Sequence, residues 1–175
     1  MSYEIEAVLL TGGASRRMGQ DKSKMLVQGE PLGARIARLL VWAGYPVTVC
    51  GREPLAGHSF LADASEFAGP LVALSQFRAT REFVFVVSCD LPGFDPRIVG
   101  RLADELGGKD AVIPSREGRL QPLCALYRST AFPIAAELVG KGEQRIFAWV
   151  DRLRVREVDD LAGDWIRNVN TPEEL

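Results

Sequence analysis

A glycine pair followed by a cluster of basic residues is the first stretch of this sequence whose residue types could do chemistry. Gly12 and Gly13 follow an apolar run, with Thr11 between the run and the glycines. Glycine permits positive φ and close backbone approach to a ligand, and the backbone N–H groups of such a loop can cradle phosphate oxygens. The combination favours a nucleoside triphosphate as the ligand. The basic residues that follow are Arg16, Arg17, Lys22 and Lys24.

The named phosphate-binding patterns do not describe this loop. A Walker loop has glycine directly before its lysine, whereas Asp21 precedes Lys22, and a GxGxxG fingerprint is absent. A tight turn followed by a solvated basic loop explains the glycines and the charges equally well. Taken alone, the loop leaves both interpretations open.

Asp90 is the second candidate, because it follows the clearest strand pattern in the chain, residues 83–87. A carboxylate placed there can hold Mg²⁺, which binds through one or two carboxylates together with substrate phosphates. The alternative is an ordinary loop aspartate that begins the next turn, with Leu91 and Pro92 behind it. A basic glycine loop at the same edge of the sheet favours the metal.

The usual protein nucleophiles lack their partners. His58 is the only histidine, it lies in a Gly- and Pro-containing stretch, and no GxSxG elbow accompanies it. The cysteines lie within or beside apolar strands and are expected in the core. Phosphoryl and nucleotidyl transfer need mainly positioning, a metal and cations, so the sequence favours that chemistry. The cysteines are Cys50, Cys89 and Cys124.

The composition excludes several classes of protein. A chain of 175 residues supports one well-buried core, which predicts a single domain over residues 1–175. A net charge of −2 argues against nucleic acid as the main partner. No apolar run approaches the roughly 20 residues that span a bilayer. The uneven cysteine spacing suits neither a disulfide framework nor a zinc site, so we expect a reducing cytoplasm.

Strand and helix patterns alternate along the chain, without a linker or a repeat. They predict a three-layer α/β domain with a mostly parallel sheet, in which ligands lie outside the carboxyl ends of the strands. Gly69-Pro70 and Asp95-Pro96 are predicted helix starts, and Gly44 a helix end. Strands are predicted over residues 5–10, 47–50, 83–87, 111–114, 123–127 and 153–158. Helices are predicted over residues 32–43, 71–77, 98–106, 134–139 and 146–150.

Several ordered motifs resemble one known family, the molybdenum cofactor guanylyltransferases. The stretch LLTGGASRRMGQDKSKMLVQGEPL, residues 9–32, is similar to the signature LAGGxxxRMGxDK, which is usually followed by a short hairpin ending in GxPL. The resemblance covers nearly the whole chain, and the order of the motifs makes it specific. The further matches are Asp63 with Gly69-Pro70-Leu71, SCDLP at 88–92, QPLCAL at 121–126, GEQRI at 142–146 and NVNTPEEL at 168–175.

The resemblance implies a Rossmann-like nucleotidyltransferase fold and a specific reaction. Enzymes of the family join GMP from GTP to the terminal phosphate of molybdopterin, or of its molybdenum form, and release pyrophosphate. The attacking phosphate oxygen is already anionic, so no general base is needed. The implied partners are GTP, molybdopterin or molybdenum cofactor, and proteins that insert the finished cofactor.

Residue roles follow from the resemblance, position by position. Arg17 and Lys22 would neutralise the triphosphate, and Asp90 would ligate Mg²⁺ and act in catalysis with them. Asn168 and Asn170 would approach the pterin substrate, or the metal, from the opposite side. The nucleotide-binding set would be Leu10, Thr11, Gly12, Gly13, Lys22, Asp63, Gly69 and Asp90, with Asp63 and Gly69 on the nucleoside side.

Three departures from the family pattern leave the choice of base open. Thr11 replaces a small alanine and adds a hydroxyl where the nucleoside packs, Gln121 stands where histidine is common, and Cys50 stands where asparagine is expected. The sister cytidylyltransferases carry an AAG-type loop, so Gly12-Gly13 favours guanine. The alternatives are a cytidylyl- or sugar-phosphate nucleotidyltransferase and a nucleotide-binding module without transferase activity.

Overall fold

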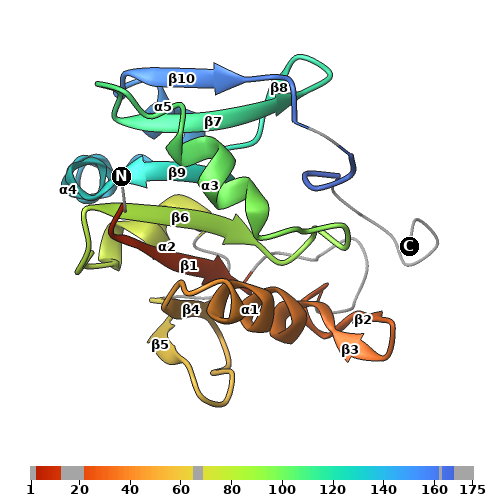
Figure 1. The fold of residues 1–175 in the computed structure, drawn as a ribbon. Helices are drawn as coiled ribbons and strands as arrows, with labels where there is room; N and C mark the ends of the chain where they lie inside the picture. Colours follow the sequence, from red (N-terminus) through yellow and green to blue (C-terminus); the bar gives the residue numbers. More distant parts are fainter. Residues whose placement is uncertain (1–2, 13–21, 65–68, 162, 168–175) are drawn as a thin grey trace.

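The chain forms a central β-sheet with helices on both faces (Figure 1). This computed structural model describes residues 3–12, 22–64, 69–161 and 163–167. The strands of the sheet are β1 (Ile5–Leu10), β4 (Val47–Gly51), β5 (Ser59–Ala62), β6 (Phe83–Ser88), β7 (Ala111–Arg116), β8 (Arg119–Leu120), β9 (Cys124–Arg128) and β10 (Val155–Val158). The helices are α1 (Leu32–Trp42), α2 (Pro70–Gln76), α3 (Arg97–Ala103), α4 (Phe132–Gly140) and α5 (Ile146–Val150), with short 3₁₀ turns η1 (Lys22–Lys24) and η2 (Ser129–Ala131).

The order of the strands across the sheet is β10-β7-β9-β6-β1-β4-β5, and β8 pairs with β7. β1 runs parallel to β4 and β6, β4 parallel to β5, and β7 parallel to β10. β9 is antiparallel to both of its neighbours, β6 and β7. The predicted three-layer α/β architecture with a mostly parallel sheet is therefore confirmed. The single domain over residues 1–175 stays a prediction.

The two faces of the sheet carry separate apolar cores. α1 and α3 pack on one face, where Ile5, Ala7 and Leu9 of β1 point, and α2, α4 and α5 pack on the other, where Val8 and Leu10 point (Figure 1). Successive side chains of a strand point to opposite faces, so a strand covered on both sides is apolar at every position. This explains why the run at residues 5–10 shows no polar alternation apart from Glu6.

The observed elements agree closely with most of the predicted ones. Residues 5–10 and 146–150 have the predicted bounds, and the strand predicted at 123–127 begins and ends one residue later. Pro70 starts α2 behind Gly69, and Gly44, with φ of 93°, follows the end of α1. β5 was missed, because its apolar run covers only residues 60–62 and is too short to indicate a strand by itself. The hairpin of β2 (Leu26–Val27) and β3 (Glu30–Pro31) precedes α1 and matches the hairpin of the family signature.

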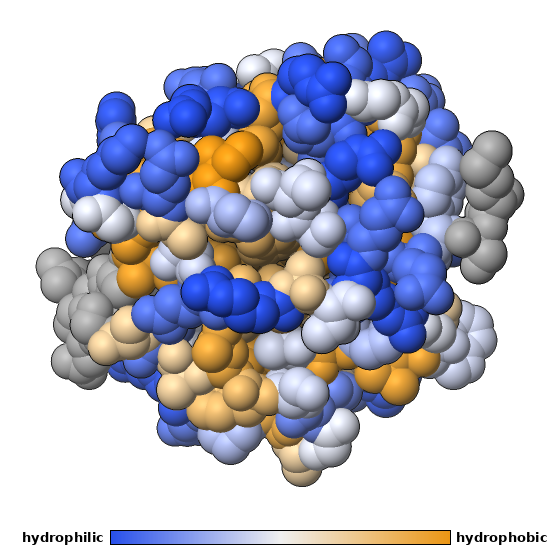
Figure 2. All heavy atoms as spheres, turned by 90° about the vertical axis from the view of Figure 1, so that its left-hand side faces the viewer, coloured by the Kyte–Doolittle hydropathy of each residue, from blue (hydrophilic) through white to orange (hydrophobic). Residues whose placement is uncertain are grey.

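Figure 2 shows the edge of the sheet at which the parallel strands begin, where hydrophilic residues cover much of the surface. Two ion pairs tie strand ends together there, Arg128 with Glu82 at 3.0 Å and Arg154 with Asp110 at 2.8 Å. None of the helices in the described ranges has the length and apolarity that a bilayer crossing requires. The loops with candidate chemistry leave the opposite edge of the sheet.

Candidate functional site

The carboxyl ends of four parallel strands, β1, β4, β5 and β6, meet at one edge of the sheet. Leu10 lies opposite Cys50 of β4 on one side and Ser88 of β6 on the other, and Gly51 lies opposite Ala62 of β5. The residues that follow these strands therefore emerge together. Among these residues, Thr11-Gly12, Asp63 and Asp90 carry groups that could bind a ligand. In an open α/β sheet a ligand site is expected at this edge, outside the carboxyl ends of the strands.

Thr11 is held against the end of β4 by two contacts to one carbonyl group. Its backbone N–H donates to the Cys50 oxygen at 2.9 Å, and its hydroxyl donates to the same oxygen at 3.3 Å. The hydroxyl that distinguishes this chain from the family pattern thus points into the protein. It satisfies a backbone acceptor and leaves the space outside the loop to a ligand.

The absence of a side chain at Gly51 makes room for Thr11. A Cβ on Gly51 would overlap the Thr11 hydroxyl oxygen and lie 3.0 Å from the Gly12 nitrogen. The end of β4 therefore needs glycine for the chain after β1 to pass so closely. Gly51 was not among the predicted site residues, although its place directly after a predicted strand is a signal for it.

Asp63 approaches Gly12 from the other side of β4. Its backbone N–H donates to the Gly51 carbonyl oxygen at 2.9 Å. A Cβ on Gly12 would overlap the Asp63 carboxylate and lie 3.2 Å from its Cγ. Two residues that lie far apart in the sequence are thus in contact, as the nucleotide-binding prediction requires.

The Asp63 carboxylate is half-buried, and within the described part of the chain it accepts no hydrogen bond. Burial raises the pKa of Asp63 above its ordinary value, and the positive charge of Arg52 opposes this shift. A carboxylate is an acceptor-only group when ionised. A carboxylate beside Gly12 that accepts no hydrogen bond from the described residues is therefore suited to N–H donors of a ligand.

We expect Asp63→Asn to stabilise the nucleotide-free protein increasingly as the pH rises. Because the pKa of Asp63 is higher in the folded than in the unfolded state, ionisation of this group lowers the stability of the wild type as pH rises from the unfolded value through the folded one. Asparagine has no charge to desolvate. Melting temperatures of both proteins between pH 4 and pH 8 test this, and a difference that is constant or shrinks with pH would contradict it.

Asp90 follows the end of β6, and one of its two carboxylate oxygens accepts a hydrogen bond. The Ser88 hydroxyl donates to its Oδ1 at 2.5 Å, and no hydrogen bond to Oδ2 is found among the described residues. The side chain is half-buried, so the carboxylate is oriented and still reachable. Ser88 was not predicted to belong to the site, and only its position two residues before Asp90 could have indicated it.

The donor set around Asp90 fits a magnesium ion held partly by substrate. Within the described ranges, no group of three or more His, Cys, Asp or Glu side chains is placed to hold a metal by itself. Mg²⁺ usually keeps several waters and binds through one or two carboxylates plus phosphate oxygens. One oriented carboxylate with a free oxygen meets that requirement, whereas a structural metal would need more protein ligands.

The cysteine thiols near the site are unsuited to nucleophilic attack. Burial, and next the charge of Asp63, raises the pKa of Cys50 to about 12. Burial, together with the charge of Asp90, also raises the pKa of Cys124 well above its ordinary value. The thiolate is the reactive form of cysteine. Cys50, Cys89 and Cys124 are buried and form no disulfide, which confirms their predicted place in the core.

The remaining predicted residues are less informative. Leu10 is buried in the core, and Gly69, with φ of 81°, directly precedes α2. Lys22 begins the η1 turn, and its side chain lies outside the described residues. Gly13, Arg17, Asn168 and Asn170 also lie outside them, so their roles stay predictions.

Comparison with known sequences points to the same chemistry as the strand-end geometry. The sequence model of the MobA-like NTP transferase domain matches residues 7–157. A probable molybdenum cofactor guanylyltransferase of Synechococcus elongatus is 32% identical, over 95% of this chain and 93% of the relative. A molybdenum cofactor guanylyltransferase of Methylibium petroleiphilum is also 32% identical, over 98% of this chain and 93% of the relative.

Solved structures share the fold at lower identity. Molybdopterin-guanine dinucleotide biosynthesis protein A from Archaeoglobus fulgidus superposes with a TM-score of 0.80 at 21% identity, covering 97% of this chain and 94% of that one. A 2-C-methyl-D-erythritol 4-phosphate cytidylyltransferase from Thermus thermophilus gives 0.70 at 17% identity, over 95% and 93% of the two chains. These likenesses show the shared fold.

Proposed function

Because the chain belongs to the MobA-like NTP transferase family, we propose that it transfers GMP from GTP to the terminal phosphate of molybdopterin or molybdenum cofactor. The reaction releases pyrophosphate and forms the guanine dinucleotide cofactor. The chain is a nucleotidyltransferase by family, and the relatives that share about a third of its residues along nearly their whole length are guanylyltransferases. Their acceptor is the one that we propose here.

The observation that supports guanine best is the contact between Asp63 and Gly12. The pairing edge of guanine presents a ring N–H and an amino group side by side, and a carboxylate can accept from both. Cytosine presents one amino group beside two acceptors, which a carboxylate would repel. The Asp63 carboxylate lies beside Gly12 and accepts no hydrogen bond from the described residues, so it complements guanine better than cytosine.

The reaction needs no proton transfer by the protein. An anionic oxygen of the acceptor phosphate forms a bond to the α-phosphorus of GTP, and the bond between the α-phosphorus and the bridging oxygen breaks, so that pyrophosphate leaves. Asp90 would hold Mg²⁺, which stabilises negative charge on the transferring group and on pyrophosphate. Ser88 orients Asp90 through its hydroxyl hydrogen bond. Arg17 and Lys22 would supply further positive charge to the triphosphate.

We expect Lys22→Ala to weaken GTP binding by about tenfold, in line with the loss of one charge-assisted contact. Binding of guanosine itself should change little, because the lysine would meet only phosphates. Titration of both ligands measures the difference, and Lys109→Ala, an exposed lysine near the opposite edge of the sheet, serves as the charge-matched control. Equal GTP affinity in the wild type and Lys22→Ala would show that the basic loop is merely solvated.

Pyrophosphate release decides between the candidate functions. The protein is mixed with Mg²⁺, molybdenum-loaded molybdopterin and either GTP, CTP or ATP. Release that requires the pterin and occurs with GTP supports the proposal, whereas release with CTP keeps the mechanism and changes the product. GTP binding without release under any condition favours a nucleotide-binding module.

Cellular location and protein partners stay predictions. The three cysteines are buried and form no disulfide, which suits a reducing compartment such as the cytoplasm. Proteins that insert the finished dinucleotide cofactor would be the natural recipients of the product.

A further inference from the structure

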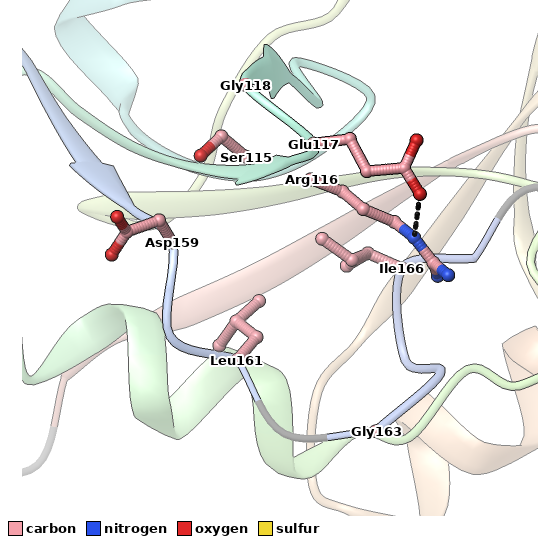
Figure 3. Close-up of a pocket in the computed structure, with 8 residues that line it drawn as sticks. All are labelled: Ser115, Arg116, Glu117, Gly118, Asp159, Leu161, Gly163 and Ile166. Carbon is pink, nitrogen blue, oxygen red and sulfur yellow. Dashed lines mark ion pairs between the residues drawn. The ribbon is translucent and has the colours of Figure 1, made fainter.

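The segment that follows β10 is anchored in an apolar core. Figure 3 shows its path beside the β7–β8 hairpin, from Asp159 past Gly163 to Ile166. Ile166 is 5% exposed and belongs to the core on the face of the sheet that α1 and α3 cover. Leu161 and Trp165 are half-buried and pack against the same core. Burial of these apolar side chains holds the segment in place.

The turn at residues 164–167 of this segment touches the loop that carries Asp90. The Arg167 N–H donates to the Asp164 carbonyl oxygen at 3.0 Å, which closes the turn. The same oxygen lies so close to Gly93 that a Cβ there would be only 2.6 Å from it. The φ of Gly93 lies outside the left-handed region that favours glycine. Close approach of the turn, rather than backbone conformation, therefore explains the glycine.

The loop between β6 and α3 is anchored on both sides of Gly93. Leu91 and Phe94 are 1% and 4% exposed, and the Phe94 N–H donates to the Leu91 carbonyl oxygen at 3.1 Å. Asp90 directly precedes the first of these anchors. Ser88 fixes the Asp90 Oδ1, but a shift of residues 91–94 would move the Asp90 backbone and redirect its second oxygen. The direction of this carboxylate therefore depends on what Gly93 packs against.

Arg97 ties the same loop to the same segment. Its Nε and Nη2 donate to the Asp95 carboxylate at 3.0 and 2.6 Å, and its guanidinium lies over the Trp165 ring, 5.3 Å from the centre. The Arg97 side chain is 76% exposed, so solvent weakens both contacts. The buried Ile166 is therefore the stronger anchor of the turn.

We propose that the turn at residues 164–167 positions Asp90, with Ile166 as its anchor and Gly93 as its point of contact. This inference rests on the proposed function, in which Asp90 would hold the metal of the GTP complex. Misplacement of a catalytic group by about 1 Å can cost about 100-fold in rate. Ile166 acts on Asp90 only through the turn and Gly93, so it is a positioning residue.

Hydrogen exchange tests the support of the loop without any substrate. Exchange of the Phe94 N–H is followed by NMR in the wild type, Ile166→Ala and Gly93→Ala, relative to the amides of β6 in the same protein. Ile166→Ala loosens the anchor, and Gly93→Ala pushes the two backbones apart. We expect exchange at Phe94 to be at least about tenfold faster in both variants.

Each variant has a matched control. Ile5 is 4% exposed in the same core, at the start of β1 and so at the opposite edge of the sheet. A Cβ on Gly108, another glycine outside the left-handed region, would meet no atom within 4 Å. Ile5→Ala and Gly108→Ala should therefore leave the relative exchange at Phe94 as it is in the wild type.

Binding of GTP then shows whether the turn positions Asp90. The Kd of GTP is measured with excess Mg²⁺ and again with EDTA. Ile166→Ala and Gly93→Ala should keep the wild-type Kd in EDTA and lose at least about fivefold of the tightening that Mg²⁺ gives. The two control variants should lose none of it. A general loss of stability would weaken binding alike in both solutions.

The two measurements separate this inference from the proposed function. Wild-type exchange at Phe94 in either variant would show that the loop stands without the turn, and would overturn the inference. Faster exchange with an unchanged effect of Mg²⁺ would also overturn it, because Asp90 would then be positioned by other contacts. If the wild type binds no GTP, the proposed function fails, and exchange still decides whether the turn supports the loop. Thermal melting checks folding, and Ile166→Val replaces Ile166→Ala if that variant does not fold.

Discussion

Asp90→Asn is expected to lower the rate of pyrophosphate release by at least about 100-fold, the scale on which removal of one preorganised electrostatic contact acts in enzymes. Asparagine keeps the shape of the side chain and an oxygen that can accept from the Ser88 hydroxyl, so the loop after β6 should keep its conformation. The negative charge that would hold Mg²⁺ is lost. Rates measured over a range of Mg²⁺ concentrations should show no recovery at saturating metal.

Two controls make the Asp90 experiment specific. Asp104→Asn removes an exposed carboxylate just beyond α3 and should leave the rate unchanged. Ser88→Ala keeps the Asp90 charge and removes only its orienting hydrogen bond, so a loss of about tenfold or less is expected. If Asp90→Asn turns over within twofold of the wild type, Asp90 has no part in the mechanism.

Gly12→Ala is expected to weaken GTP binding by at least about tenfold while leaving the protein folded. The added methyl group would overlap the Asp63 carboxylate, whose Cγ would lie only 3.2 Å away. The carboxylate is the end of a side chain that can rotate, so the fold survives and Asp63 moves off the nucleoside. Calorimetric titration with GTP measures the loss, and melting curves report the stability.

Gly100→Ala is the matched control for that substitution. Gly100 lies within α3, and a Cβ there would meet no atom within 4 Å. Alanine in a helix interior is more stable than glycine by roughly 0.5–1 kcal/mol. The control should therefore melt at a slightly higher temperature and bind GTP like the wild type.

A double-mutant cycle shows whether Gly12→Ala acts through Asp63. If it does, Asp63→Ala and Gly12→Ala each weaken GTP binding, and the pair together is little worse than either one. Additive losses would mean that the methyl group disturbs the loop itself, and that the contact between Gly12 and Asp63 is incidental. Gly51→Ala differs from both, because its methyl group would press on Thr11 and on the Gly12 backbone nitrogen, and it should also lower the melting temperature.

Local patterns in the sequence were sufficient for most of the architecture. Residues 5–10 are apolar on both faces of a strand, and Gly69-Pro70 fixes the start of a helix by its backbone preferences alone. β5 escaped this reasoning, because Ser59–Ala62 forms a strand only by pairing with the edge of β4. Strands of that kind are stabilised by a neighbour, which no local pattern displays.

Part of the candidate site could likewise be predicted from the sequence, and part of it could not. The sequence by itself determined which residue types were available: a glycine loop with basic residues, Asp90 after a buried strand, and no nucleophile with a partner. These conclusions depend only on the chemical groups of the individual side chains, which do not change with their position in the fold. The ordered motifs also determined the family, which the comparisons confirm.

The tertiary structure alone decided which of these residues meet. The register of β1, β4 and β5 places Asp63 over Gly12 and turns the Thr11 hydroxyl onto the Cys50 carbonyl, because Gly51 has no side chain to keep them apart. The Gly93 position lies against Asp164, so the loop after β6 packs against the segment that follows β10. Contacts between segments so distant in the sequence depend on sheet register, which exists only once the chain has folded. The sequence shows where the glycines are, but only the fold shows which groups they allow to come close.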